Sequence, residues 1–193
     1  GKPTEEDRIL FFKLKVQISI LLELAKSFDE HWIGINTHNA NKLCVEAIKT
    51  GKIPELDGYS ELATERPYGN EKSRIDILLT DGAKSPCYVE VKSVTLLKDE
   101  QGYFPDAKTA RGAKHLRELI QTVQLGHRAV LLFCAQHTGI NSVAVAKDID
   151  PEYAELLHQA IHQGVEVLAY GCSINEEKIE INQQLAVNVE NNC

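Results

Sequence analysis

Three side chains suited to a divalent-metal site lie close together in the sequence, in two segments that both have the pattern of β-strands. Residues 73–79 contain Asp76, and residues 88–92 contain Glu90 and Lys92. Both segments are rich in β-branched residues, which strands favour. Residues two apart on a strand project from the same face, so Glu90 and Lys92 should point together, about 6–7 Å apart along the backbone.

A turn signal between these two segments would bring the acids together. Asp81 and Gly82 form a dipeptide that is typical of a tight turn. If the chain reverses near Ala83, Asp76 comes to lie opposite Glu90. Two carboxylates would then converge beside a lysine, in one small region of a sheet.

Such a group has the chemistry of phosphodiester cleavage. Mg²⁺, or Mn²⁺ in its place, takes oxygen ligands, which Asp76, Glu90 and the Val91 carbonyl could supply. The metal would polarise a phosphate and acidify a bound water, while Lys92 would orient that water or neutralise developing charge. The alternative is an ordinary solvated sheet face, because a short strand carrying one acid and one base is common.

The elements around this pair indicate an α/β fold. Residues 31–35 have the pattern of a strand, and Asn39 or Asn41 could cap a helix that ends at Gly51. Its apolar face would be Leu43, Cys44, Ala47 and Ile48. Glu46 flanks that face, where it could reach the metal or be a solvated helix residue.

The second half of the chain alternates helices and strands. Residues 109–125 have helical periodicity, and residues 128–135 form an apolar run typical of a strand buried on both faces. Asp150 and Pro151 begin a second helix that ends at Gly164, and strands are expected at 165–170, 179–181 and 185–189. Residues 93–108 are expected to be a long connection. Together these elements predict a mixed sheet flanked by helices.

Basic residues near the start of the 109–125 helix could contact nucleic-acid phosphates. They are Arg111, Lys114, His115 and Arg117. Arg74, two residues before Asp76, is a further candidate for nucleic-acid binding. A solvated helix face is the alternative. The net charge of the chain is −7. Residues 129–193 alone have a net charge of −7, whereas residues 42–128 have a net charge of +1. This balance argues against indiscriminate nucleic-acid binding but allows a local basic groove.

The composition is that of an ordinary globular protein that functions in the cytoplasm. There are five scattered cysteines with no Cys-x-x-Cys pair, which favours reduced thiols over disulfides or a zinc site. No apolar run is long enough to span a bilayer, so we expect no membrane partner. His158 and His162 would share a helix face, but no third ligand is evident.

The Asp … Glu-x-Lys pattern resembles that of restriction-endonuclease-like nucleases. Over about residues 28–189 the chain also resembles the sugar fermentation stimulation protein A (SfsA) family. The strings that carry this resemblance are residues 36–42, 53–59, 73–76, 87–96, 102–107, 111–116, 126–130 and 165–170.

The resemblance implies a bacterial DNA-binding protein connected with regulation of sugar metabolism, notably that of maltose. It implies a restriction-endonuclease-like domain at 36–193, with Asp76, Glu90 and Lys92 as its nuclease-type residues and Glu46 as an accessory acid. Residues 1–35 would be a β-rich segment, in place of the longer OB-like barrel expected of the family.

Three hypotheses follow: a Mg²⁺-dependent nuclease, a DNA-binding regulator without turnover, and a metal-binding or protein-interaction domain that has lost its nucleic-acid role. A homodimer is also considered.

Overall fold

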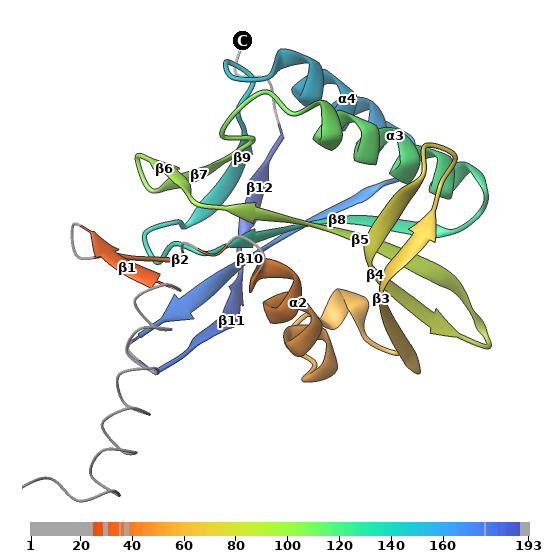
Figure 1. The fold of residues 1–193 in the computed structure, drawn as a ribbon, viewed down its shortest axis with the longest axis horizontal. Helices are drawn as coiled ribbons and strands as arrows, with labels where there is room; N and C mark the ends of the chain where they lie inside the picture. Colours follow the sequence, from red (N-terminus) through yellow and green to blue (C-terminus); the bar gives the residue numbers. More distant parts are fainter. Residues whose placement is uncertain (1–24, 29–30, 35, 37–38, 176, 190–193) are drawn as a thin grey trace, which may run out of the picture.

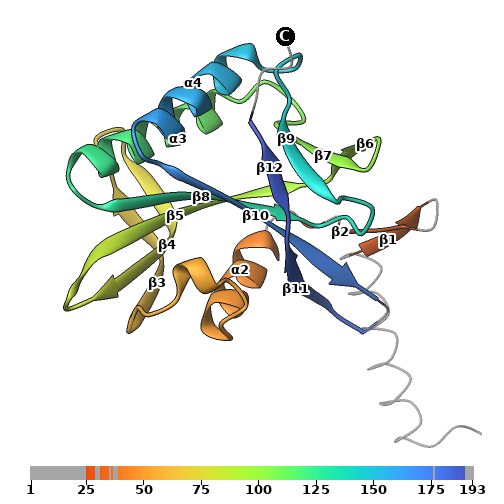
Figure 2. The same ribbon diagram turned by 180° about the vertical axis from the view of Figure 1, so that it is seen from behind.

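The computed structural model describes residues 25–28, 31–34, 36, 39–175 and 177–189. Figures 1 and 2 show the molecule from opposite sides. Its elements in chain order are β1 (Ala25–Phe28), β2 (His31–Gly34), α2 (Asn39–Lys49), the 3-10 turn η1 (Pro54–Leu56), β3 (Glu61–Tyr68), β4 (Ser73–Asp81), β5 (Lys84–Val94), β6 (Leu96–Lys98), β7 (Gln101–Phe104), α3 (Ala110–Gln124), β8 (Arg128–Ala135), β9 (Ser142–Val145), α4 (Pro151–His162), β10 (Glu166–Ile174), β11 (Ile179–Gln184) and β12 (Ala186–Asn188).

A mixed sheet forms the centre of the molecule, in the strand order β11-β10-β8-β5-β4-β3. The three central strands run parallel, and the outer pairs are antiparallel. Figure 1 shows α3 and α4 side by side on one face and α2 on the other. Helices therefore flank a mixed sheet, as the sequence predicts.

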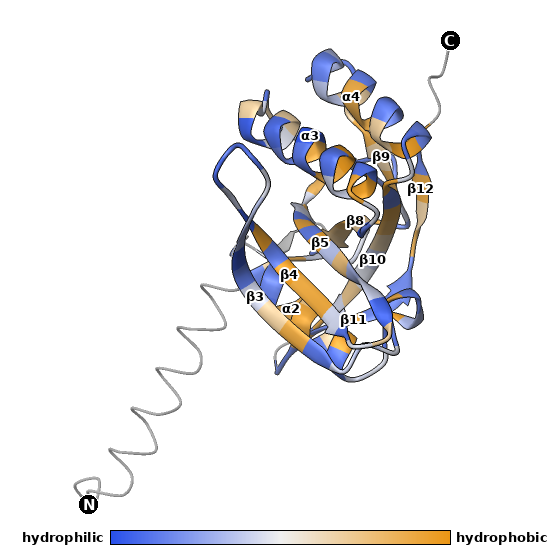
Figure 3. Cartoon of the chain, turned by 90° about the vertical axis from the view of Figure 1, so that its right-hand side faces the viewer, coloured by the Kyte–Doolittle hydropathy of each residue, from blue (hydrophilic) through white to orange (hydrophobic). Residues whose placement is uncertain are grey.

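Strand β8 is shared by two hydrophobic cores. Every residue from Ala129 to Ala135 is buried, because both faces of this strand are covered. Val130, Leu132 and Cys134 pack in the core beneath α2, whereas the alternate residues pack beneath α3 and α4. Figure 3 shows the hydrophobic colouring of the central strands and of the inner sides of the helices.

The two helices of the second half begin at side-chain caps. Thr109 Oγ1 accepts a hydrogen bond of 2.9 Å from the Gly112 amide at the start of α3. Asp150 Oδ1 accepts one of 3.0 Å from the Tyr153 amide at the start of α4. Both predicted helices are confirmed.

A second sheet lies where the sequence suggested a long connection. Residues 93–108 contain β6 and β7, which pair with β9 and β12 in the order β12-β9-β7-β6. The prediction of an irregular connection was therefore wrong for much of this segment. These strands have only three or four residues each, too few for a clear alternating pattern.

Strand β3 was also missed, although it pairs with β4 along its whole length. It contains Pro67, and Glu65 has a positive φ of 54°, although the register is the same on both sides of Glu65. Proline is tolerated because β3 is the edge strand of the sheet.

Residues 1–24 of the expected N-terminal β-rich segment lie outside the described residues. The described part after them contains the antiparallel pair β1 and β2. No helix in the described ranges is long and apolar enough to cross a membrane.

Candidate active site

The hairpin of β4 and β5 positions the two predicted acids. Its ladder pairs Ile77 with Val89, and Asp76 and Glu90 are the next residue on each strand. The turn is held by the Ala83 amide, which donates to Asp81 Oδ1 at 3.0 Å. The structure thus brings Asp76 and Glu90 together, as the turn signal indicated.

Asp76 is held by one donor from each side. Asn41 Nδ2 donates to Oδ1 at 2.7 Å, and the Val91 amide donates to Oδ2 at 2.8 Å. Burial and the charge of Glu90 nevertheless raise the pKa of Asp76 above its ordinary value. The opposing effects of Val91, Asn41 and Lys92 are smaller, so the carboxylate lies in a place that disfavours its own charge.

Glu90 is almost completely buried, with 1% of its surface exposed. Its Oε1 atom accepts a hydrogen bond of 2.7 Å from Lys92 Nζ and also contacts His115 Nδ1. Burial alone would raise the pKa of Glu90, but hydrogen bonding from His115 and the charge of Lys92 outweigh it and lower the pKa. Glu90 is therefore held as a carboxylate.

His115 belongs to this cluster and not to a surface patch. It is 5% exposed, and its Nδ1 atom lies 3.0 Å from Lys92 Nζ. Arg111 Nε donates to Nε2 at 3.5 Å, and Nδ1 also contacts Glu90 Oε1, so the ring links three charged side chains. The helix turns His115 toward the sheet and not toward solvent, so its contact with phosphates stays a prediction.

One oxygen of Glu90 has no hydrogen-bond partner. Oε2 is buried and unpaired among the described residues. A buried carboxylate oxygen without a donor is costly, and a cation would satisfy it. Two neighbouring carboxylates, one with a raised pKa, thus fit a hard divalent ion. Within the described ranges, no group of three or more His, Cys, Asp and Glu side chains is placed to hold a metal ion.

The structure does not bring Glu46 to the two acids. Its side chain is exposed on α2, whereas Asn41 on the same helix makes the contact with Asp76. Five residues separate them, which is about 140° around an α-helix, so they cannot share a face. Sequence reasoning identified the correct helix but gave Asn41 a capping role. The position of an asparagine along a helix does not show which distant residue its side chain will contact.

The other predicted basic residues are solvent-accessible but differ in their partners. Arg111 is exposed beside His115, and Lys114 is half-buried. Arg117 makes a two-point ion pair with Glu71, at 2.9 and 3.1 Å, and Arg74 lies 3.7 Å from Glu65. Arg111 and Lys114 thus remain the best placed of the four to reach a phosphate near the acids.

Two buried residues near the site were not predicted. Tyr68 is 9% exposed, and its hydroxyl has no partner in the described structure. Burial raises the pKa of Tyr68, and the charges of Glu90, Glu118 and Asp76 raise it further. Glu118, one turn after His115, accepts a hydrogen bond of 2.9 Å from the Glu71 amide. The spacing of His115 and Glu118 was visible in the sequence, but the basic neighbours suggested a solvated face.

Comparison with known proteins gives consistent matches. The profile of the family described as "Sugar fermentation stimulation protein RE domain" matches residues 38–178. A "Sugar fermentation stimulation protein homolog" from Pseudoalteromonas atlantica is 57% identical over 171 residues, which cover 89% of this chain and 73% of that protein. One from Shewanella loihica is 61% identical over 153 residues, which cover 79% of this chain and 65% of that protein.

A solved structure matches as well. The structure of Pyrococcus furiosus SfsA in complex with Ca²⁺ superposes with a TM-score of 0.78 at 30% identity, covering 86% of this chain and 71% of that one. Together with the mixed sheet and its flanking helices, these matches confirm the expected restriction-endonuclease-like fold.

Proposed function

The chain belongs to the sugar fermentation stimulation protein (SfsA) family, and we propose that it is a DNA-binding protein with a divalent-metal nuclease centre at Asp76, Glu90 and Lys92. The observation that carries the proposal is the buried, unpaired Glu90 Oε2 beside a second carboxylate. The Ca²⁺ in the complex of the P. furiosus relative supports a divalent ion at this fold.

Asp76, Glu90 and the Val91 carbonyl would hold Mg²⁺ or Mn²⁺. The bound ion would supply charge neutralisation at the phosphate and an acidified water. Lys92 Nζ, 2.7 Å from Glu90, would stabilise charge on the phosphate oxygens. His115 is a positioning residue, since it holds Glu90 and Lys92.

Cleavage of DNA in the presence of Mg²⁺ or Mn²⁺ tests this function. Supercoiled, linear duplex and single-stranded DNA would be incubated with the native chain and with Glu90→Gln and Lys92→Met. We expect each substitution to slow cleavage about 100-fold or more. Glu46→Gln is the matched control, because the exposed Glu46 should leave the rate unchanged. Absence of cleavage of every DNA form would contradict nuclease activity. Equal loss in the control would contradict the assignment of the centre to Asp76, Glu90 and Lys92.

A DNA-binding regulator without turnover is the second candidate. The names of the relatives connect the family with sugar fermentation, and the exposed Arg111 gives this reading a phosphate contact. Binding without cleavage, with affinity that falls steeply as salt rises, would favour it. DNA affinity that does not change with salt would contradict the regulator. A metal-binding or protein-interaction domain would then be the remaining hypothesis. Regulation of maltose metabolism, residence in the cytoplasm and a homodimer remain proposals.

A further inference from the structure

Two adjoining hollows extend from the candidate active site across the second sheet. The smaller, of about 240 Å³, is lined by Lys92 together with Tyr103 and Leu96. The larger, of about 850 Å³, is also lined by Tyr103 and Leu96. Because the two hollows share these residues, they adjoin, and we call the pair the groove. The smaller hollow includes Lys92, a proposed catalytic lysine.

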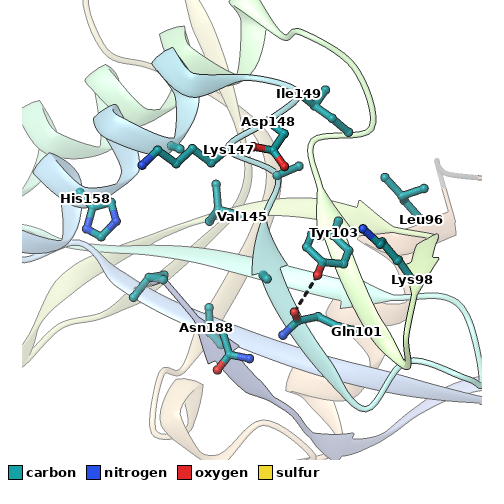
Figure 4. Close-up of a pocket in the computed structure, with 15 residues that line it drawn as sticks. Leu96, Lys98, Gln101, Tyr103, Val145, Lys147, Asp148, Ile149, His158 and Asn188 are labelled. Atoms are coloured by element: carbon teal, nitrogen blue, oxygen red, sulfur yellow. Dashed lines mark hydrogen bonds between the residues drawn. The ribbon is translucent and has the colours of Figure 1, made fainter. Parts of the chain in front are cut away.

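The larger hollow gathers basic side chains from separate elements. Figure 4 shows Lys98 from β6 near Tyr103 at one end, and His158 from α4 at the other, with Lys147 between β9 and α4. None of these three basic groups makes an ion pair within the described ranges. Among the described residues, Asp148 is the acidic residue that lines the larger hollow, and Asp106 lines the smaller one. The larger hollow therefore gathers two lysines against one carboxylate, on a chain whose net charge is −7.

Tyr103 has a fixed and accessible ring. Its hydroxyl donates to Gln101 Oε1 at 2.9 Å, and Gln101 Nε2 in turn donates to Ser142 Oγ at 3.1 Å. The ring is half-buried, so part of it lies open to the groove. Beside it, Leu96 is 37% exposed, which is unusual for a leucine in this structure. An oriented aromatic ring between free lysines is the arrangement on which bases stack while phosphates are neutralised.

We propose that this groove binds single-stranded DNA that continues from the strand held at Asp76 and Glu90. A base would stack on Tyr103, and Lys98 and Lys147 would contact phosphates. The inference rests on the proposed function, because the metal centre at Asp76 and Glu90 is where the DNA strand would enter the groove. It adds a substrate class, which is DNA with a single-stranded portion, and a binding surface outside the metal centre.

Fluorescence anisotropy with a labelled oligodeoxynucleotide of about ten residues, within the site sizes of roughly 4–16 nucleotides, measures the binding. Tyr103→Leu removes the ring but keeps an apolar side chain, and should weaken binding about fivefold or more. Tyr103→Phe keeps the ring and should bind within about twofold of the native chain. Equal affinity of the leucine variant and the native chain would overturn the proposal.

The salt dependence of binding gives an independent test that does not require a change at Tyr103. The double variant Lys98→Gln/Lys147→Gln should lower the slope of log affinity against log salt by about 1.4, at roughly 0.7 per contact with a single strand. Lys49→Gln, at an exposed lysine of α2 that lines neither hollow, should leave the slope unchanged. An equal effect in this control would contradict a local groove.

Failure of the groove can be distinguished from failure of the metal centre. If Tyr103→Leu binds normally but the native chain cleaves DNA with Mn²⁺, the groove is wrong and the proposed function stands. If cleavage is absent but Tyr103 and the two lysines govern single-strand binding, the groove is supported and the nuclease function is not. Tighter binding of an RNA of the same sequence would overturn the assignment to DNA. A change in the oligomeric state of Tyr103→Leu without a change in DNA affinity would show that a second copy of the chain covers the hollow, which also overturns the proposal.

Discussion

Asp76 and Glu90 carry like charges side by side, but their surroundings act on them in opposite directions. The cation of Lys92 and the imidazole of His115 lower the pKa of Glu90, while the pKa of Asp76 is raised by burial and by Glu90 itself. Glu90 therefore stays ionised, whereas Asp76 is more easily protonated than an ordinary aspartate. In the absence of a cation, the second carboxylate is a source of instability in the folded protein.

Replacement of Asp76 by asparagine should stabilise the metal-free protein at neutral pH. The substitution removes the disfavoured charge, and Asn41 can rotate its amide so that both hydrogen bonds of Asp76 are replaced. We expect the melting temperature to rise by about 2–4 °C, which corresponds to about 1 kcal/mol in a chain of this size. The rise in melting temperature that Mn²⁺ causes in the native chain should be absent from the variant. A lower melting temperature in the variant would contradict this account.

The raised pKa of Asp76 also fixes the pH dependence of metal binding. The folded protein holds this proton to a higher pH than the unfolded chain does, so protonation of Asp76 stabilises the folded state at acidic pH. That contribution is lost as the pH rises through the folded pKa, and the ionised pair that binds metal then appears. The rise in melting temperature caused by Mn²⁺ should therefore shrink as the pH is lowered from neutral through the folded pKa of Asp76. A rise that stays constant until the protein unfolds in acid would exclude the mechanism.

Substitution of His115 should affect metal affinity through Glu90. His115→Ala leaves a buried carboxylate with one donor fewer, which should cost about 1–3 kcal/mol of unfolding free energy. His115→Asn places an amide nitrogen near the position of Nδ1 and should restore much of the Mn²⁺ affinity. Calorimetric titration with Mn²⁺ separates the two variants. Equal affinities for alanine and asparagine would show that His115 acts only through packing.

The residues of the site could be predicted from sequence only where their contacts are local. Asp76, Glu90 and Lys92 lie on one hairpin, so strand alternation and a turn signal were enough to place them together. The contacts of Asn41 and His115 cross about 35 and 25 positions of the chain. No periodicity encodes such contacts, and a histidine among exposed basic residues has the same pattern whether it points inward or outward.

At the scale of elements, Asp150 joins the beginnings of two helices. Its Oδ1 caps α4 through the Tyr153 amide, and its Oδ2 accepts a hydrogen bond of 2.9 Å from the Thr109 amide, next to the start of α3. Hydrogen bonding to Thr109 is the leading cause that lowers the pKa of Asp150. One carboxylate thus fixes the relative position of the two helices that cover the sheet beside Glu90.

Replacement of Asp150 by alanine should destabilise the protein by about 0.5–2 kcal/mol, the usual cost of a lost N-cap, or more because two amides lose their acceptor. The depressed pKa makes this contribution largest above the pKa of the unfolded chain. It is lost as the pH falls through the folded pKa. Urea unfolding at pH 7 and at about pH 3 measures the difference. Glu152→Gln, at an exposed neighbour in the same turn, is the control and should change little.

The elements that were predicted correctly have strong local signals. Strand β8 is a continuous apolar run, and α3 and α4 have caps and glycine stops. Strands β6, β7, β9 and β3 were missed because each is short or lies at an edge, where pairing partners and not the side-chain pattern determine the structure.

At the scale of the whole molecule, β8 makes the two cores interdependent. Leu131 packs beneath α3 and α4, and Leu132 packs beneath α2, yet they are adjacent on one strand. Loss of packing on either side should therefore weaken the same backbone hydrogen bonds to β5 and β10.

Leu131→Ala and Leu132→Ala should each lower the free energy of unfolding by about 2–5 kcal/mol, because both side chains are fully buried. Each variant should still unfold in a single transition, whether it is monitored by circular dichroism or by the fluorescence of Trp32. Leu125→Ala, at a leucine that is 71% exposed, is the control and should change stability little. Separate transitions for the two probes would show that the cores unfold independently.

The parallel pairing at the centre of the sheet also sets an order of events during folding. Ile77 and Val89 meet across a short hairpin, whereas Cys87 pairs with Arg128, about 40 residues later. Local hairpins close in about 1–10 μs, and distant pairings are slower because a long loop must first be closed. We therefore expect the acidic pair to assemble early in the folding reaction and the imidazole of His115 to arrive late, once β8 has docked.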